Sequence, residues 1–280
     1  MPDGHEKQLD DGWTHIGKCK GKAPVHVHGL NPQMRDATVE KIRAEFEIKM
    51  KRWRNSSCYQ QVRQILDRQQ PEGGWQIGDA VCLATGSFSR DNWQSRQRSL
   101  AQFVAFMAVI QHLQKTQSTK ILCYAQEPCY TPLDRDFLAS MGVTNLHHDV
   151  TSDDFGLGAA AEHLNASTFV FEPFMDLGVE SMRALFGAGV RLYIGSSVQR
   201  WVDDIKKSAA DIKVDIRRRR GVSDEGITAD HIDQLKMQSK QAEQFVRSRR
   251  SYKFPRFEED PNVFEGLTIF WKEAQDDEEG

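Results

Sequence analysis

The chain has 280 residues, a formal net charge of −3 and 39% hydrophobic residues, enough for one large domain or two small ones. This charge gives no sign of bulk attraction to nucleic acid or to an anionic membrane, and no apolar segment approaches the length of a membrane span. The five cysteines show neither CxxC nor framework spacing, which favours a reducing compartment. Since the N-terminus lacks the apolar core of a signal peptide, we expect a soluble cytoplasmic protein, with a nuclear location also open.

The sequence pattern changes several times and divides the chain into one domain with additions. The first residues are rich in Gly, Pro, His and charge without any period, as in disordered segments. A helical stretch follows, and then apolar runs alternate with helical stripes. We expect a disordered tail over 1–37, a helical addition over 38–79, a domain over 80–271 with a charged insertion at about 203–260, and an acidic tail over 272–280.

Several helix boundaries can be predicted from local signals. Apolar residues recur at helical spacing from Ile42 to Met50, and a second stripe follows a break at 55–57, where we expect a serine to cap the next helix. Further along, Thr131 is expected to cap a helix with Pro132 in its first position and Gly142 just past its end.

Five short apolar runs have the length and character of strands. Because helical segments lie between most of them, they predict an α/β fold. We expect a Rossmann-like three-layer sandwich, with a mostly parallel sheet of five to six strands in the order 3-2-1-4-5 and helices on both faces. A final apolar alternation within 263–272 is expected to add an edge strand. The five runs are 80–85, 120–125, 143–148, 167–173 and 190–197.

Four sequence blocks in a fixed order, with a fifth at the end of the chain, indicate a family. They read CLATGSFSRDNWQSRQRSLAQFVAF, ILCYAQEPCYTPLDRDFLASMGV, FVFEPFMD and LYIGSSV, followed by FEGLTIFWK. In this order the chain resembles the sensitivity-to-red-light-reduced (SRR-like) domain family over about 80–202 and the last strand. The resemblance implies a regulatory role, since members are associated with light and circadian-clock input in plants and with heme regulation or cytoskeletal phenotypes elsewhere. It implies no established reaction.

The chain departs from the family pattern at four places. Ala84 stands where the family often has a glycine, and Glu127 stands where it usually has an aspartate before proline. Residues 173–175 read Pro-Phe-Met in place of Pro-His-Cys, and Ser196 replaces an asparagine. Any family chemistry that used that histidine and cysteine is therefore not available in the same form here.

Small and acidic residues follow several predicted strands at their carboxyl ends, where open parallel sheets bind ligands. The loop after the first strand offers amides and hydroxyls that suit an anion, and the acid after the second strand stands where dinucleotide folds place a ribose-binding carboxylate. A single glycine matches neither GxGxxG nor a Walker loop, so a tight turn with serine caps remains an alternative. The candidate ligand-binding residues are Thr85, Gly86, Ser87, Ser89, Glu127, Glu172, Gly195 and Ser196.

Three classes of function remain open. The first is a regulatory protein that binds a small nucleotide-like or anionic ligand at the strand ends. The second is an enzyme dependent on S-adenosylmethionine or a nucleotide, in which Glu127 and Glu172 do acid–base work. The third is an interaction module that contacts protein partners through the charged segment 203–260. The sequence names neither a catalytic residue nor a cofactor.

The histidines and the basic runs have simpler explanations. His26, His28 and the pair at 147–148 lack a third ligand nearby, so no metal site is expected. The arginine-rich runs at 217–220 and 247–250 fit a nuclear-import address or a phosphate-contacting patch. Acidic residues around them favour a solvated charged face instead.

Overall fold

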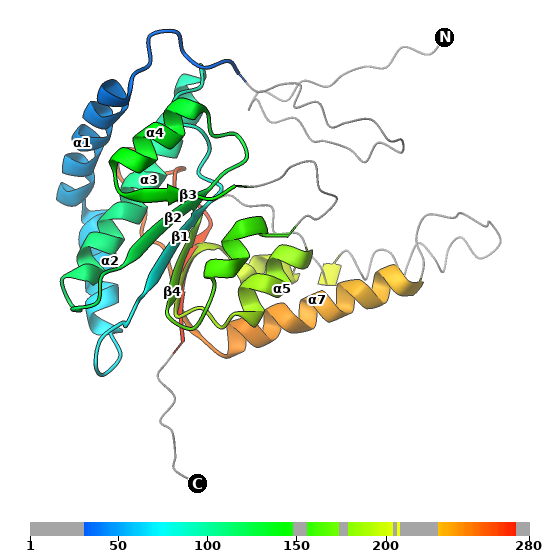
Figure 1. Ribbon diagram of the computed structural model, residues 1–280. Coiled ribbons are helices and arrows are strands. Elements are labelled where there is room, and N and C mark those ends of the chain that lie inside the picture. Colours follow the sequence, from blue (N-terminus) through cyan, green and yellow to red (C-terminus); the bar gives the residue numbers. More distant parts are fainter. Residues whose placement is uncertain (1–30, 148–155, 174–178, 204–205, 208–228, 273–280) are drawn as a thin grey trace, which may run out of the picture.

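The computed structural model describes residues 31–147, 156–173, 179–203, 206–207 and 229–272. Most of the two predicted tails, the basic run at 217–220 and the family-divergent Phe174 and Met175 lie outside the described residues. The described part of the chain forms one sheet with helices packed against both faces (Figure 1). None of its helices is both long enough and apolar enough to cross a membrane.

The sheet has seven strands in the order β3-β2-β1-β4-β5-β7-β6. The first five strands in this order are parallel to one another. β7 is antiparallel to both of its neighbours, β5 and β6. The predicted α/β class and the order 3-2-1-4-5 are therefore confirmed, with one strand more than expected. The strands are β1 (Asp79–Leu83), β2 (Leu122–Gln126), β3 (Val143–Asn145), β4 (Thr168–Glu172), β5 (Leu192–Ser196), β6 (Arg250–Lys253) and β7 (Leu267–Trp271).

The expected position of the last strand was wrong. β7 does not form the edge of the sheet, because it pairs with β5 on one side and with β6 on the other. The strand β6 was missed because its sequence, Arg-Ser-Tyr-Lys, has no apolar run. All four of its residues are exposed, so its pairing with β7, rather than its own side chains, makes it a strand.

Helices cover both faces of the sheet because the strands alternate their apolar side chains between two cores. Cys82 and Phe169 face the core under α1 to α4, whereas Val81 and Val170 face the core that includes Phe245 of α7. The helices are α1 (Val39–Asn55), α2 (Ser57–Arg68), α3 (Trp93–Gln114), α4 (Pro132–Ser140), the 3₁₀ helix η1 (Gly158–His163), α5 (Val179–Gly187) and α7 (Ala229–Arg247).

The predicted helix boundaries are confirmed. Ser56 caps α2, where its side chain accepts from the Tyr59 N–H. Thr131 caps α4 with Pro132 in the first turn. Gly142 follows the end of that helix with a φ of +72°, a conformation that glycine adopts without steric cost.

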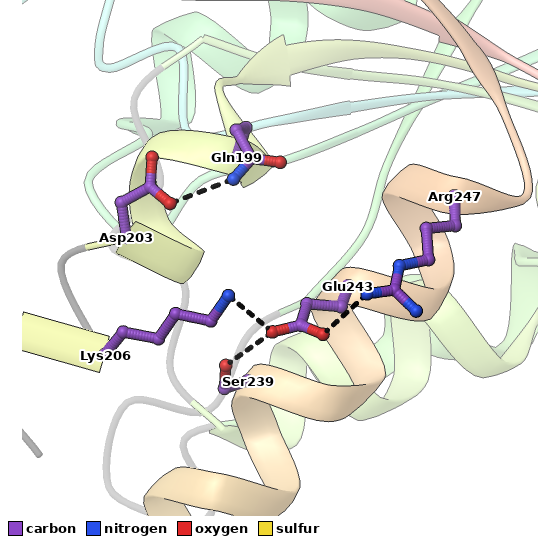
Figure 2. A network of polar contacts seen from close by, with 6 residues as sticks. All are labelled: Gln199, Asp203, Lys206, Ser239, Glu243 and Arg247. Atoms are coloured by element: carbon purple, nitrogen blue, oxygen red, sulfur yellow. Dashed lines mark hydrogen bonds and ion pairs between the residues drawn. The ribbon is translucent and has the colours of Figure 1, made fainter.

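The charged segment 203–260 contains elements that belong to the domain. α7 packs against α5, and Phe245, Phe254 and Phe257 from this segment are buried in the two cores. Glu243 of α7 accepts from Lys206, which lies in the segment that follows β5 (Figure 2); the distance between Nζ and Oε1 is 2.7 Å. Solvent screens this ion pair because the Lys206 side chain is exposed, so the buried aromatic side chains are the main attachment.

Candidate functional site

The loop after β1 is joined to the end of β2 by a carboxylate. The Gly86 N–H donates to Oε2 of Glu127 at 2.9 Å, and the Cys129 N–H donates to Oε1 at 3.1 Å. Gly86 has a φ of +75°, which presents its N–H to this side chain. The Gly86 N–H, which a phosphate would have used in the predicted loop, is therefore already bonded to the Glu127 carboxylate.

A second acid, Asp134, holds the same loop from the first turn of α4. Its carboxylate accepts from the Ser87 hydroxyl at 2.6 Å, the Phe88 N–H at 3.1 Å and the Thr131 N–H at 2.8 Å. Asp134 is fully buried, so these donors replace its hydration. Asp134 was not among the residues predicted from the sequence, although its place three residues after the Thr131 cap is the spacing of a capping box.

The remaining hydroxyls of the loop are also engaged within the protein. Thr85 bonds to the Tyr130 hydroxyl at 2.8 Å, and Ser89 bonds to the Thr131 hydroxyl at 2.7 Å. The side chains of Thr85 and Ser89 are buried. These hydroxyls therefore fix the loop to the segment that follows β2.

The helix α3 begins well after the glycine of the loop. Asn92 caps it and accepts from the Ser95 N–H, six residues beyond Gly86. The N-terminal amides of α3 are therefore not part of the Gly86 turn, and the helix-terminus argument for anion binding does not apply to that turn.

A short segment before α1 covers the outer end of the loop. The N–H of Met34 donates to the Ser89 carbonyl at 2.9 Å, and the N–H of Asp91 donates to the Pro32 carbonyl at 2.7 Å. Residues 31–34 thus add hydrogen bonds to the loop from a distant part of the sequence.

The other predicted residues form a second group at the ends of β4 and β5. Glu172 is fully buried and accepts from the Tyr193 hydroxyl at 2.7 Å and the Ser196 N–H at 3.1 Å. Burial, together with the negative charge of Glu172, raises the pKa of Tyr193 well above its usual range. Gly195 lies under the Tyr193 ring, since a Cβ at this position would be 2.5 Å from Cζ and the hydroxyl oxygen.

The two groups flank the point where the strand order reverses, because β1 and β4 are direct neighbours. Glu172 points to the same face of the sheet as Val170, two residues earlier, and this is the face on the α5 side. Glu127 instead contacts the β1 loop on the α4 side. From the sequence, all eight residues were expected at the same edge of the sheet, as one set of candidate ligand-binding residues. The contacts among the described residues instead join Thr85, Gly86, Ser87, Ser89 and Glu127 in one group, and Glu172, Gly195 and Ser196 in another.

The cysteines near these groups are poor nucleophiles. Burial, followed by the nearby charge of Glu127, raises the pKa of Cys82 and of Cys129. A thiol reacts as its thiolate, so both remain unreactive near neutral pH. The described residues contain no group of three His, Cys, Asp or Glu side chains placed to hold a metal ion.

A surface depression of about 390 Å³ lies elsewhere, along the second half of α1. Arg54, at its rim, donates to Gln111 near the C-terminal end of α3, which is the end of α3 distant from the β1 loop. The depression is therefore separate from both groups of predicted residues. It is lined by Phe46, Glu47, Met50, Lys51, Arg54 and Asn55.

Together these features define an α/β domain with a doubly wound sheet and two polar groups at the carboxyl ends of its parallel strands. The model of the SRR1 domain matches residues 58–271, and the chain belongs to this family. The match runs from α2 to the end of β7 and therefore includes α7 and β6. No curated protein and no solved structure matches the chain.

Proposed function

We propose that this SRR1-family chain is a regulatory protein that binds a small nucleotide-like ligand at the ends of β1 and β2. The observation that carries the proposal is the placement of Glu127. Two backbone N–H groups hold its carboxylate at the end of the second strand, directly against the β1 loop. Doubly wound folds use an acid at this position to accept hydrogen bonds from ribose hydroxyls.

The chemistry of Glu127 supports a hydroxyl-bearing ligand. Each carboxylate oxygen accepts one N–H, and a carboxylate offers about four acceptor positions. A side-chain hydrogen bond also joins Cys129 to Glu127, and the residue is partly exposed, so a remaining acceptor position can face a ligand hydroxyl. An anionic ligand at the Gly86 amide is less well supported, because it would have to displace a negative charge.

A regulatory rather than a catalytic role is supported by the state of the neighbouring groups. The Ser87 hydroxyl donates to buried Asp134, and burial keeps the thiols of Cys82 and Cys129 protonated by raising each pKa. The buried Ser87 hydroxyl therefore holds the loop in place, and neither thiol is an activated nucleophile.

The test is a thermal-shift measurement on the full chain with adenosine, AMP, S-adenosylmethionine, inorganic phosphate and heme, each at millimolar concentration. We expect a nucleoside-containing ligand to raise Tm by about 3 °C or more if its concentration is about ten times Kd. Phosphate alone is expected to produce no shift.

Two variants locate the binding. Glu127→Ala should abolish the ligand-induced shift, while Glu72→Ala, an exposed acid on the turn before β1, should retain it. A Glu127→Ala protein that shifts as the wild type does, or a wild type that responds to none of the nucleosides, would rule out the proposal. Turnover of S-adenosylmethionine or of the nucleotide would replace the regulatory reading with an enzymatic one.

A further inference from the structure

The strand β6 is an exposed edge of the sheet. It pairs with β7 on its inner side, and among the described residues no strand lies beyond it. All four of its residues are exposed. Edge strands of this kind present unpaired backbone groups that can pair with another extended chain.

The direction of the outward backbone groups follows from the pairing. The Phe254 N–H, just past the end of β6, donates to the Leu267 carbonyl at 2.9 Å. Because the groups of an antiparallel strand alternate between its two sides, Tyr252 also faces β7. The N–H and C=O groups of Ser251 and Lys253 therefore point away from the sheet, where they offer two donors and two acceptors to an added strand.

The edge is also basic. The segment 247–253 reads Arg-Ser-Arg-Arg-Ser-Tyr-Lys, with four cationic residues and no acid. Arg249 turns inward, where it donates to the Val190 carbonyl and lies over the Phe245 ring. The exposed side chains of Arg250 and Lys253 are on the strand itself and, by alternation, on opposite faces of the sheet.

An aromatic surface lies beside these charges. The Tyr252 ring stacks on Trp271 with a centroid distance of 5.8 Å and an interplanar angle of 12°, yet Tyr252 remains 48% exposed. An added strand would bring an apolar side chain next to this ring, and such cross-strand pairs contribute about 0.2–1 kcal/mol each.

We propose that β6 docks an extended acidic peptide as an eighth strand of the sheet. Backbone hydrogen bonds to Ser251 and Lys253 would supply the main attachment, as in other cases of strand addition. Lys253 would select acidic side chains on its face of the sheet, while apolar side chains of the peptide would lie beside Tyr252 on the other face. This function is independent of the ligand proposed for the ends of β1 and β2.

The same features disfavour two other occupants. A second copy of the chain would bring one basic edge against another, and like charges on facing strands are destabilising. A nucleic acid would meet the cations but would not reproduce the strand hydrogen bonds to Ser251 and Lys253. Both alternatives are outcomes of the test below.

The test uses the full chain and a fluorescent peptide of six alternating Glu and Val residues, with binding measured by fluorescence anisotropy. Ser251→Pro removes the outward N–H but leaves the bonds between β6 and β7 in place, and it should weaken binding at least about tenfold. Ser251→Ala, which keeps the backbone donor, should bind as the wild type does. Lys253→Glu should also weaken binding, and added salt should reduce the wild-type affinity.

Three further probes make the outcome independent of how well Ser251→Pro folds. Two control peptides should bind the wild type at least about tenfold more weakly than the Glu-Val peptide does. One is a Lys-Val peptide, and the other is the Glu-Val peptide methylated at two consecutive backbone nitrogens. A single-stranded oligonucleotide should not compete with the acidic peptide. Equal binding of the Lys-Val or methylated peptide, displacement by the oligonucleotide, or a wild-type dimer that Ser251→Pro dissociates would overturn the proposal.

Discussion

Tyr193 donates its hydroxyl hydrogen to Glu172 at 2.7 Å, and it reaches this carboxylate because its ring crosses a residue without a side chain. Gly195 is two positions along the same strand, so its missing Cβ leaves the space that the Tyr193 ring occupies. A buried carboxylate is stable only with donors of this kind. The glycine, the tyrosine and the acid therefore depend on one another, although the acid comes from a neighbouring strand.

Gly195→Ala is expected to destabilise the protein by about 1–3 kcal/mol, the usual cost of overpacking. The new Cβ would lie 2.8 Å from the Glu172 carbonyl oxygen as well as 2.5 Å from the tyrosine, and a backbone atom cannot move aside easily. Urea unfolding would measure the change. Gly187→Ala is the matched control, because no atom lies within 4 Å of the added Cβ. Alanine also favours a helix over glycine by about 0.5–1 kcal/mol. Equal losses of stability in the two variants would contradict the expected clash at Gly195.

Tyr193→Phe is expected to change how stability depends on alkaline pH. Burial, followed by Glu172, raises the pKa of Tyr193 in the folded protein, whereas in the unfolded chain this pKa is about 10. Above about pH 10 the unfolded state releases this proton and the folded state keeps it, so stability falls by about 1.4 kcal/mol per pH unit. The contribution is complete below pH 10 and is lost as pH rises.

Free energies of unfolding between pH 8 and 11 would test this expectation. Phenylalanine cannot ionise, so the variant should lose less stability per pH unit than the wild type above about pH 10. It should also be less stable by about 1.5–3 kcal/mol at pH 8, because Glu172 loses a donor. Parallel curves over the whole range would show that Tyr193 does not titrate differently in the two states.

Asp134→Asn is expected to destabilise the protein by about 3 kcal/mol, because an amide nitrogen would face the hydrogen-bond donors that the carboxylate now accepts. Ser87, Phe88 and Thr131 supply these donors. Asp136→Asn, an exposed residue of the same helix, should change stability by no more than about 0.5 kcal/mol. If chemical denaturation shows similar midpoints for the two variants, the carboxylate does not hold the β1 loop.

Ala84→Gly is expected to stabilise the protein by about 0.5–1 kcal/mol. Ala84 has a φ of +53°, a left-handed conformation in which a Cβ is strained, and the family often carries a glycine here. Ala80→Gly, within β1, should instead be destabilising, because it removes a fully buried methyl group and loosens a strand. A lower thermal midpoint for Ala84→Gly would show that the Ala84 side chain contributes more through packing than it costs in strain.

The helix boundaries could be predicted because their signals are local. A hydroxyl at Ser56 or Thr131 satisfies a backbone N–H three residues later, so neighbouring residues in the sequence contain the whole interaction. The parallel core could be predicted for a similar reason, since strands buried on both faces read as continuous apolar runs. β6 could not be predicted, because its partner β7 lies 14 or more residues further along the chain and its own residues are polar.

The candidate residues illustrate the same division. Their position at the carboxyl ends of the strands followed from the order of apolar runs, and the structure places them there. Their partners did not follow, because Gly86 and Glu127 are 41 residues apart and Glu172 and Tyr193 are 21 apart. Ser87 and Ser89 were read as donors for a ligand, whereas both are buried and bonded within the protein.

The sequence by itself determined the α/β class, the SRR-like family and the set of residues that reach one edge of the sheet. Alternation, capping and strand length depend on neighbouring residues, and these are visible in the order of letters. Only the tertiary structure decided that this set divides into two groups, that carboxylates occupy the amides of the β1 loop, and that a basic strand forms the outer edge. Hydrogen-bond partners and exposed edges depend on distances between segments far apart in the chain, and only the assembled sheet sets those distances.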